Sequence, residues 1–344
     1  MDELVVALDV GGTNTRARIA TLAADGEPRP ATPDVTRCVA SAHELRDFVS
    51  EVAQTAARLG TVTGSVIAVA GPVVGDRIRI TNWPSDPVVD ISDLEDAGLP
   101  RSRTRFVNDA VAGAWGALSR LDPATPVAHT EPLGVNRPGG SGLEDGNLVY
   151  VAPGTGLGEA VVVRYGLESR QVTVVAGEYQ HTQMPRFSGD IARVVHAIGD
   201  ALGRAPDWED LVSGRGLVRT YDALRAIAAH APLTISDDDA HRAGAVGEAA
   251  RLGSDPQALA AAFLFYQVLA HFAQMLAITF LPCGAVVFGG VSSERNVELM
   301  RRSGMAGTFA EHHRFAGLLA AVPLHVVGGE VNLEGALRLA AQAR

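Results

Sequence analysis

One pattern constrains the fold more than any other, because it occurs twice, once near the start of each half of the chain. The first copy is an apolar run from Leu4 to Asp9, a glycine-rich turn, and a second apolar run from Ala17 to Leu22. The second copy runs from Leu148 to Arg164 around the turn PGTGLG. Two apolar runs joined by a glycine turn predict a β-hairpin. Since the separation is too long for a solenoid repeat, the sequence predicts a duplicated α/β fold with a cleft between its halves.

Composition excludes several kinds of protein. The formal net charge of −10 argues against a nucleic-acid partner. All 29 basic residues are arginine, so a Walker-type loop, a protein kinase site and Schiff-base chemistry, which each need a lysine, are excluded. The two cysteines, Cys38 and Cys283, lie far apart, which argues against a disulfide framework or a cysteine zinc site. The acidic N-terminus lacks the positive charge of a secretory signal, so we expect a cytoplasmic protein.

The longest apolar stretch, Ala258 to Leu281, is long enough to span a membrane. Three polar residues in it, Gln267, His271 and Gln274, have the spacing that places them on one face of a helix. The preceding Asp255-Pro256 pair has the residue types of an N-cap and a first helical position. We therefore predict a long buried helix with one polar edge and no membrane partner.

Two glycine-rich turns have the chemistry of phosphate binding. In DVGGTNTR, Asp9 to Arg16, backbone N–H groups can approach an anion closely, side chains add donors, and the acidic residue could hold a metal ion through water. An ordinary hairpin explains this motif equally well. The second turn, Gly154 to Gly158, favours phosphate, because two such turns can grip one polyphosphate. A third element is the apolar strand that ends at Gly289-Gly290, where the glycine pair would open a flat slot for adenine. Without the other two elements, this glycine pair would indicate only a turn.

Seven segments in chain order resemble the bacterial glucokinase family, in its zinc-free branch, within the sugar kinase and actin-like superfamily of duplicated ATPases. They are LDVGGTNTR, AVAGPVVGDRIRITN, FVNDAVA, APGTGLG, GEYQH, EDLVSGRGL and VVFGGV. The resemblance implies an α/β fold of the duplicated actin-like, ribonuclease-H-like ATPase type. It implies a small domain of residues 1–110 plus 330–344 and a large domain of residues 111–329. It also implies ATP and Mg²⁺ as cofactors, a small-molecule sugar substrate and a homodimer.

The resemblance assigns residues to the nucleotide by their match to the family's motifs. The positions are Asp9, Gly11, Gly12, Thr13, Asn14, Thr15, Arg16, Gly154, Thr155, Gly156, Gly158, Gly289 and Gly290. Asp9 is also the expected contact to Mg²⁺ through water. The implied reaction is phosphorylation of the primary (6-)hydroxyl of a hexose, with glucose as the leading candidate.

Asp109 is the predicted catalytic base. In phosphoryl transfer a carboxylate accepts the proton of the attacking hydroxyl, and the family places its base at the Asp of an Asn-Asp pair after a strand. Asn108 would then bind ring hydroxyls, and Gly71 belongs to the same set of sugar-binding positions. An isolated Asn-Asp pair is more often a helix cap, but here the motif context favours catalysis.

Glu178, His181 and Glu209 match the family's remaining sugar contacts. Carboxylates accept hydrogen bonds from vicinal hydroxyls, and a histidine can donate or accept one more. A Glu-x-x-His pair is also half of a metal site, but no second pair or cysteine cluster in the sequence completes it.

Tyr179 and Gln180 stand where the family carries two glycines. Drift in a tolerant turn explains this. The alternative is a reshaped pocket for an aminohexose such as kanosamine, or for a C7-cyclitol of a biosynthetic pathway. A non-catalytic sensor on the same scaffold would require a broken turn or a missing base, and an acetate-type kinase would lack the sugar-binding set.

Overall fold

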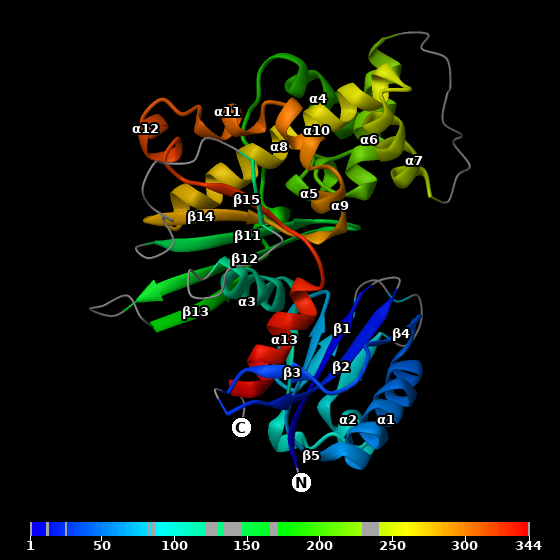
Figure 1. Cartoon of the computed structure of the whole chain (residues 1–344). Helices are drawn as coiled ribbons and strands as arrows, with labels where there is room; N and C mark the ends of the chain where they lie inside the picture. The colour runs from blue at the N-terminus through cyan, green and yellow to red at the C-terminus, as the bar shows by residue number, and fades with distance from the viewer. Residues whose placement is uncertain are drawn as a thin grey trace. The chain divides into compact units, whose positions relative to one another are not determined.

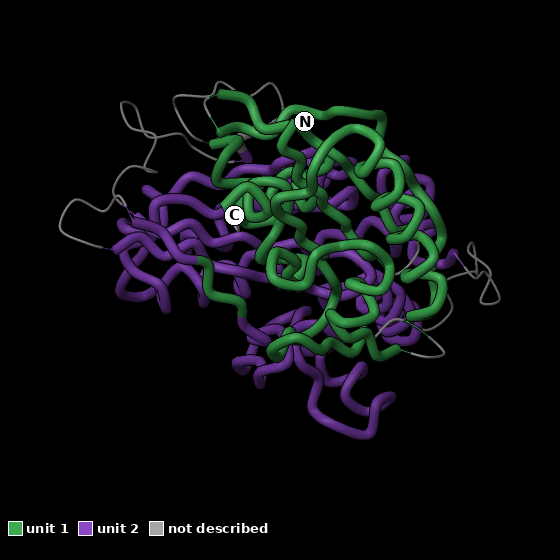
Figure 2. Tube along the Cα trace, turned by 90° about the horizontal axis from the view of Figure 1, so that it is seen from below, with its two compact units in different colours: residues 1–125, 174–176, 330–344 green, residues 126–173, 177–329 purple. Residues whose placement is uncertain are grey.

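The computed structural model describes residues 2–11, 14–24, 26–80, 83, 87–121, 130–133, 146–165, 171–228 and 241–342. The chain divides into two compact units (Figure 2). Unit 1 comprises Met1–Thr125, Val174–Ala176 and Glu330–Arg344, and unit 2 comprises Pro126–Thr173 and Gly177–Gly329. The cleft expected between the two halves stays a prediction.

The sheet of unit 1 begins with the predicted hairpin. Its strands are β1 (Asp2–Val10), β2 (Thr15–Leu22), β3 (Pro28–Pro30), β4 (Val35–Arg37), β5 (Gly60–Val69) and β9 (Thr104–Asn108). Their order is β3-β2-β1-β5-β9, with β4 also paired to β2. β1 pairs antiparallel with β2 and parallel with β5, and β5 pairs parallel with β9. The carboxyl ends of β1, β5 and β9 therefore lie along one edge of the sheet, where ligands bind in open α/β folds.

Helices cover both faces of this sheet (Figure 1). Alternate residues of β1 (Leu4, Val6 and Leu8) are buried with α1 (Ala42–Leu59), and the residues between them are buried with α13 (Val331–Gln342). Since both faces are covered, β1 is apolar throughout rather than alternating. A smaller sheet and a short helix complete the unit: β6 (Val73–Val74), β7 (Arg77–Arg79), β8 (Val88–Asp90) and α2 (Ile91–Asp96).

α3 (Asp109–Leu121) crosses α13 so closely that the backbones of the two helices are in contact. A Cβ atom at Gly116 would lie 2.0 Å from the carbonyl oxygen of Val331, and one at Gly335 would lie 1.8 Å from that of Ala112. Only glycines permit so close a crossing. Because α3 packs there, unit 1 extends past residue 110, the boundary expected from the sequence.

The sheet of unit 2 repeats the strand order of unit 1. Its strands are β10 (Thr130–Pro132), β11 (Asn147–Pro153), β12 (Leu157–Tyr165), β13 (Gln171–Ala176), β14 (Cys283–Phe288) and β15 (Leu324–Val327), and the last three residues of β13 are grouped with unit 1. Their order is β10-β15-β14-β11-β12-β13. β11 pairs antiparallel with β12 and parallel with β14, as β1 does with β2 and β5. This repetition confirms the predicted duplication.

The helices of unit 2 gather around one long core helix. They are α4 (Gly189–Leu202), α5 (Trp208–Leu211), α6 (Gly214–Ile227), α7 (Arg242–Leu252), α8 (Pro256–Thr279), α9 (Gly290–Arg295), α10 (Val297–Arg302), α11 (Met305–Ala310) and α12 (Ala316–Leu319). α8 is the predicted buried helix: Asp255 caps it, and Gln267 and Gln274 donate to backbone carbonyls of neighbouring segments. Although α8 is long and apolar enough to cross a membrane, 61% of its apolar 18-residue stretch is buried inside the protein.

Candidate active site

Asn108 is fixed at the carboxyl edge of the unit 1 sheet. Its amide nitrogen donates to the carbonyl oxygen of Gly71 at 3.1 Å, and its amide oxygen accepts from the Ala110 backbone at 2.9 Å. Gly71 has a φ of 125°, a conformation that favours glycine, and this turn brings its carbonyl to Asn108. The structure thus brings Gly71 and Asn108, both predicted from sequence, into direct contact.

Asp109 is the first residue of α3 and is half-buried. One of its carboxylate oxygens accepts from the Ala110 backbone at 2.9 Å. The positive end of the α3 dipole stabilises negative charge at this position. Since the neighbouring Asn108 also bonds the first turn, the start of the helix does not depend on Asp109 alone.

Asp9 lies at the end of β1 in a small charged cluster. Burial raises the pKa of its carboxyl to about 6, although Arg16 and a hydrogen bond from Asn332 oppose the rise. Arg16 in turn pairs with Glu330 at 2.7 Å. Glu330 and Asn332 come from the far end of the chain, and no motif in the sequence identified them.

The rest of the first turn is only partly open to a ligand. Gly11 donates to the Asn14 carbonyl at 3.1 Å, and Asn14 is exposed. Thr15 is fully buried in β2, so its hydroxyl does not face solvent as the phosphate-binding hypothesis required. Gly12 and Thr13 lie outside the described residues.

We expect Asp9→Asn to make the metal-free protein more stable near neutral pH. The folded-state pKa of Asp9 is raised, so its contribution to stability is fully present below pH 3.8 and is lost as the pH rises through about 6. Ionising it in place costs roughly 3 kcal/mol at neutral pH. Urea unfolding should show the advantage of the variant widening by about 2 kcal/mol between about pH 4.5 and 7.5. A constant difference across this range would contradict the burial argument.

The second turn is hydrogen-bonded to Glu209. Within the turn, Gly154 donates to the Gly156 carbonyl at 2.8 Å. The backbone nitrogen of Leu157 donates to Glu209 Oε2 at 3.0 Å, and a Cβ at Gly156 would lie 2.7 Å from the same oxygen. The glycine therefore lets the carboxylate approach the turn. Gly158, which the sequence placed in the turn, lies instead in β12, paired opposite Ala152.

Glu178 precedes a short 3₁₀ turn, and His181 is the last residue of that turn. His181 Nε2 is 3.8 Å from Glu178 Oε2, and His181 Nδ1 is 3.3 Å from Asp207 Oδ2. Glu209 is the second residue of α5, the short helix that Asp207 caps. The structure thus connects the two segments that carry the predicted sugar contacts. The side chains of Glu178 and His181 are half exposed and open to a ligand.

Tyr179 and Gln180 point in different directions. The Tyr179 ring packs in the core of unit 2, edge-on to Phe280 with centroids 5.9 Å apart. Gln180 is buried, and its amide nitrogen donates to Glu178 Oε2 at 2.6 Å. Glu159, also buried, accepts from the Tyr179 backbone at 2.8 Å and orients the segment. Of the two atypical residues, Gln180 is therefore the one that contacts a predicted sugar-binding group.

We expect Gln180→Ala to raise the KM for the sugar about tenfold with a smaller change in kcat. A hydrogen bond to a charged group is worth about 1.5–3 kcal/mol, and without it Glu178 is free to leave its position. Steady-state kinetics at saturating ATP measure the effect. The matched control is Gln54→Ala, since Gln54 lies exposed on α1 and its amide donates to the Ser50 hydroxyl of the same helix. An unchanged KM for the sugar would mean that Gln180 does not hold Glu178.

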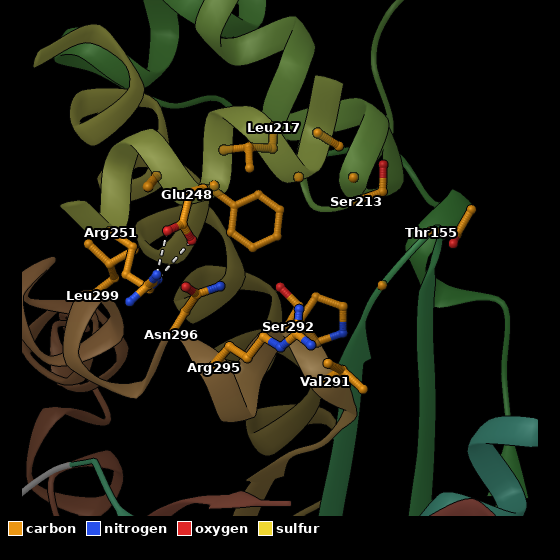
Figure 3. A pocket seen from close by; sticks show the side chains of 18 of the residues that line it. Thr155, Ser213, Leu217, Glu248, Arg251, Val291, Ser292, Arg295, Asn296 and Leu299 are labelled. Atoms are coloured by element: carbon orange, nitrogen blue, oxygen red, sulfur yellow. Dashed lines mark hydrogen bonds and ion pairs between the residues drawn. The ribbon is translucent and has the colours of Figure 1, made fainter. Parts of the chain in front are cut away.

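A cavity of about 550 Å³ opens beside the second turn within unit 2 (Figure 3). Gly154 and Thr155 line it; Thr155 lies at one side, and the ion pair between Glu248 and Arg251 lies at the other. Its walls come from α6, α7, α8 and the segment that contains α9. Tyr266 on α8 is hydrogen-bonded to Ser292 and Asn296, and its burial raises the pKa of its hydroxyl. The volume is in the range of sites for small molecules.

The glycine pair after β14 shapes this cavity indirectly. A Cβ at Gly289 would lie 2.2 Å from the Tyr150 hydroxyl, and Gly290 has a φ of 85°. Both glycines are thus required by packing and by the turn, while Val291 and Ser292, which follow them, line the cavity. The assignment of Gly289 and Gly290 to the nucleotide stays a prediction, and neither glycine lines the cavity itself.

The duplicated sheets and their glycine turns define a two-domain actin-like ATPase fold, and solved structures agree. A glucokinase from Balamuthia mandrillaris in complex with glucose superposes with a TM-score of 0.78 at 24% identity, covering 98% of this chain and 94% of that one. A ROK family glucokinase from Streptomyces griseus in complex with glucose and AMPPNP gives 0.62 at 22% identity, covering 98% and 99%.

The sequence comparisons give the family. The glucokinase family model matches residues 6–343. Glucokinase from Mesorhizobium japonicum is 30% identical, over 98% of this chain and 90% of the relative. Glucokinase from Paramagnetospirillum magneticum is 29% identical, over 95% and 94%. The chain belongs to the glucokinase family and is a glucokinase-type sugar kinase. ATP binding follows from this membership.

Proposed function

We propose that the chain transfers the γ-phosphoryl group of ATP to the primary (6-)hydroxyl of glucose. One observation supports this most: the hydrogen bond from Leu157 to Glu209, which ties the second glycine turn to a carboxylate of the sugar-binding motif. A backbone suited to phosphate thus lies beside a group suited to sugar hydroxyls. Relatives with the glucokinase name, and the glucose complex of the Balamuthia mandrillaris enzyme, support the choice of glucose.

Unit 2 would bind both substrates. Glu178 and Glu209 would accept hydrogen bonds from ring hydroxyls, with His181 at one more. The cavity beside the second turn would hold the nucleoside, with the phosphates at Gly154 and Thr155. Carboxylates suit this task because they accept from two hydroxyls at once.

Unit 1 would supply the base. Asp109 accepts the proton of the primary hydroxyl while that oxygen attacks the γ-phosphorus, and ADP leaves in line. Asn108, held by Gly71, would orient the hydroxyls beside it. Asp9 is a part-buried carboxylate whose negative charge lacks full compensation, which fits a nearby cation. It would hold Mg²⁺ through water, and the ion supplies charge neutralisation at the phosphates.

A sugar panel tests the substrate. We expect glucose to give the highest kcat/KM in an ADP-release assay with ATP and Mg²⁺, against aminoglucoses including kanosamine and against cyclitols. A higher value for an aminohexose or a cyclitol would replace glucose by that class, for which Gln180 beside Glu178 is the one supporting contact. No turnover with any of these sugars would overturn the proposed function.

We also propose that the chain is a cytoplasmic homodimer, as its resemblance to the family implies. Light scattering at micromolar protein concentration tests the assembly. A mass near 35.9 kDa, that of one chain, would exclude the dimer.

A further inference from the structure

Arg215 lies between the two predicted substrate sites of unit 2. It is the second residue of α6, and its Nη2 donates to Glu209 Oε1 at 3.2 Å. The start of this helix is fixed to the second turn, because Gly214 donates to the Gly154 carbonyl at 2.8 Å. Ser213 caps the helix and donates to the Glu209 carbonyl at 2.8 Å. Turn, carboxylate and guanidinium are thus linked by a continuous set of hydrogen bonds.

The same arginine lines the cavity proposed for the nucleotide. Because the chain has no lysine, permanent positive side-chain charge at the nucleotide phosphates must come from arginine, and Arg215, Arg251 and Arg295 line the cavity. Arg251, also in the lining, is held by two hydrogen bonds to Glu248. Arg215 has one contact of 3.2 Å to Glu209, and its side chain is 67% exposed. An exposed single contact of this kind is weak, so a phosphate that accepts bidentate bonds would displace it.

Glu209 is held differently at its two oxygens. Oε2 accepts from the Leu157 backbone, which is part of the sheet hairpin, while Oε1 accepts from the exposed Arg215 side chain. If the guanidinium moves to a phosphate, Oε1 becomes free for a sugar hydroxyl while Oε2 keeps the carboxylate in place. Arg215 would then have a different partner in the presence and in the absence of nucleotide.

We propose that Arg215 is a positioning residue that couples the two substrates. Without nucleotide it occupies Glu209, and with nucleotide it binds the phosphates and releases Glu209 to the sugar. Nucleotide binding then strengthens sugar binding, and by thermodynamic reciprocity the sugar strengthens nucleotide binding by the same factor. This inference rests on the proposed function, which assigns sugar to Glu209 and phosphates to the Gly154 turn.

Binding measurements on Arg215→Met test the proposal. We expect calorimetry to show about tenfold weaker binding of ADP and AMPPNP, with adenosine unchanged, since only phosphates contact the guanidinium. The coupling is measured as the glucose Kd without ADP divided by the glucose Kd with ADP. This ratio should be at least about fivefold smaller in Arg215→Met than in wild type. The matched control is Arg193→Met on α4, where the arginine pairs with Asp190 at an exposed site and all ratios should stay at wild-type values.

The outcomes separate this inference from the proposed function. Equal losses for adenosine and ADP would show a purely structural role and overturn the inference. An unchanged coupling ratio in Arg215→Met, in a wild-type protein that phosphorylates glucose, would also overturn it and leave the proposed function standing. A wild-type protein that phosphorylates no sugar of the panel would instead remove the proposed function, together with the inference that rests on it.

Discussion

Asp109→Asn should lower kcat by about 10²–10⁴ while sugar binding persists. The amide cannot accept the proton of the attacking hydroxyl, but its oxygen can still accept from the Ala110 backbone, as the carboxylate does. The start of α3 is further secured by Asn108, so the fold should be retained. Single-turnover ADP release measures the chemical step, and glucose titration in the same buffer measures binding.

Two comparisons separate the loss of the base from a loss of folding. Circular dichroism melting of Asp109→Asn should lie close to wild type, because the first-turn hydrogen bond is kept and only the interaction of the charge with the helix dipole, about 0.3–1 kcal/mol, is lost. Asp109→Ala removes both the base and that bond, so it should be equally inactive and also less stable. More than a tenth of wild-type turnover in the Asn variant would mean that another group accepts the proton.

Gly335→Leu should destabilise unit 1 by about 3 kcal/mol or prevent folding. Its first side-chain carbon would lie 1.8 Å from the Ala112 carbonyl oxygen and 2.6 Å from the Gly116 nitrogen. Both contacts are with backbone, which cannot rotate away as a side chain can. The helices α3 and α13 must therefore separate, and the separation would also displace Asp109 at the start of α3.

Urea unfolding of Gly335→Leu and of a matched glycine variant tests this prediction. The control is Gly307→Ala in α11, where an added Cβ has nothing within 4 Å. Since alanine favours helix over glycine, the control should be as stable as wild type or up to about 1 kcal/mol more stable. If Gly335→Leu unfolds at the wild-type urea concentration, the close crossing of the two helices is wrong.

The hairpins and the buried helix could be predicted because their signals are local. A glycine turn between apolar runs specifies β1 and β2, and an Asp-Pro cap before an apolar run specifies α8. The burial of Thr15 also had a local signal that the phosphate-binding hypothesis overlooked. Thr15 shares its side of β2 with Ala17 and Ile19, and all three are buried.

The cavity walls and the charged cluster had no such signal. Tyr266 and Asn296 meet across elements that are separate in sequence, and so do Asp9 and Asn332. Periodicity shows that a helix has a buried face, but not which neighbour covers it. The contact between Arg215 and Glu209 likewise depends on how α6 begins against the second turn.

The sequence by itself determined the duplication, the two glycine turns and the Asn-Asp pair, because each depends on a few adjacent residues and their backbone preferences. Only the tertiary structure decided that Tyr179 enters the core while Gln180 holds Glu178, and that α3 belongs with α13 in unit 1. The physical reason is the same in both cases. Burial and side-chain partners depend on which surfaces pack together, and segments distant in the chain supply those surfaces.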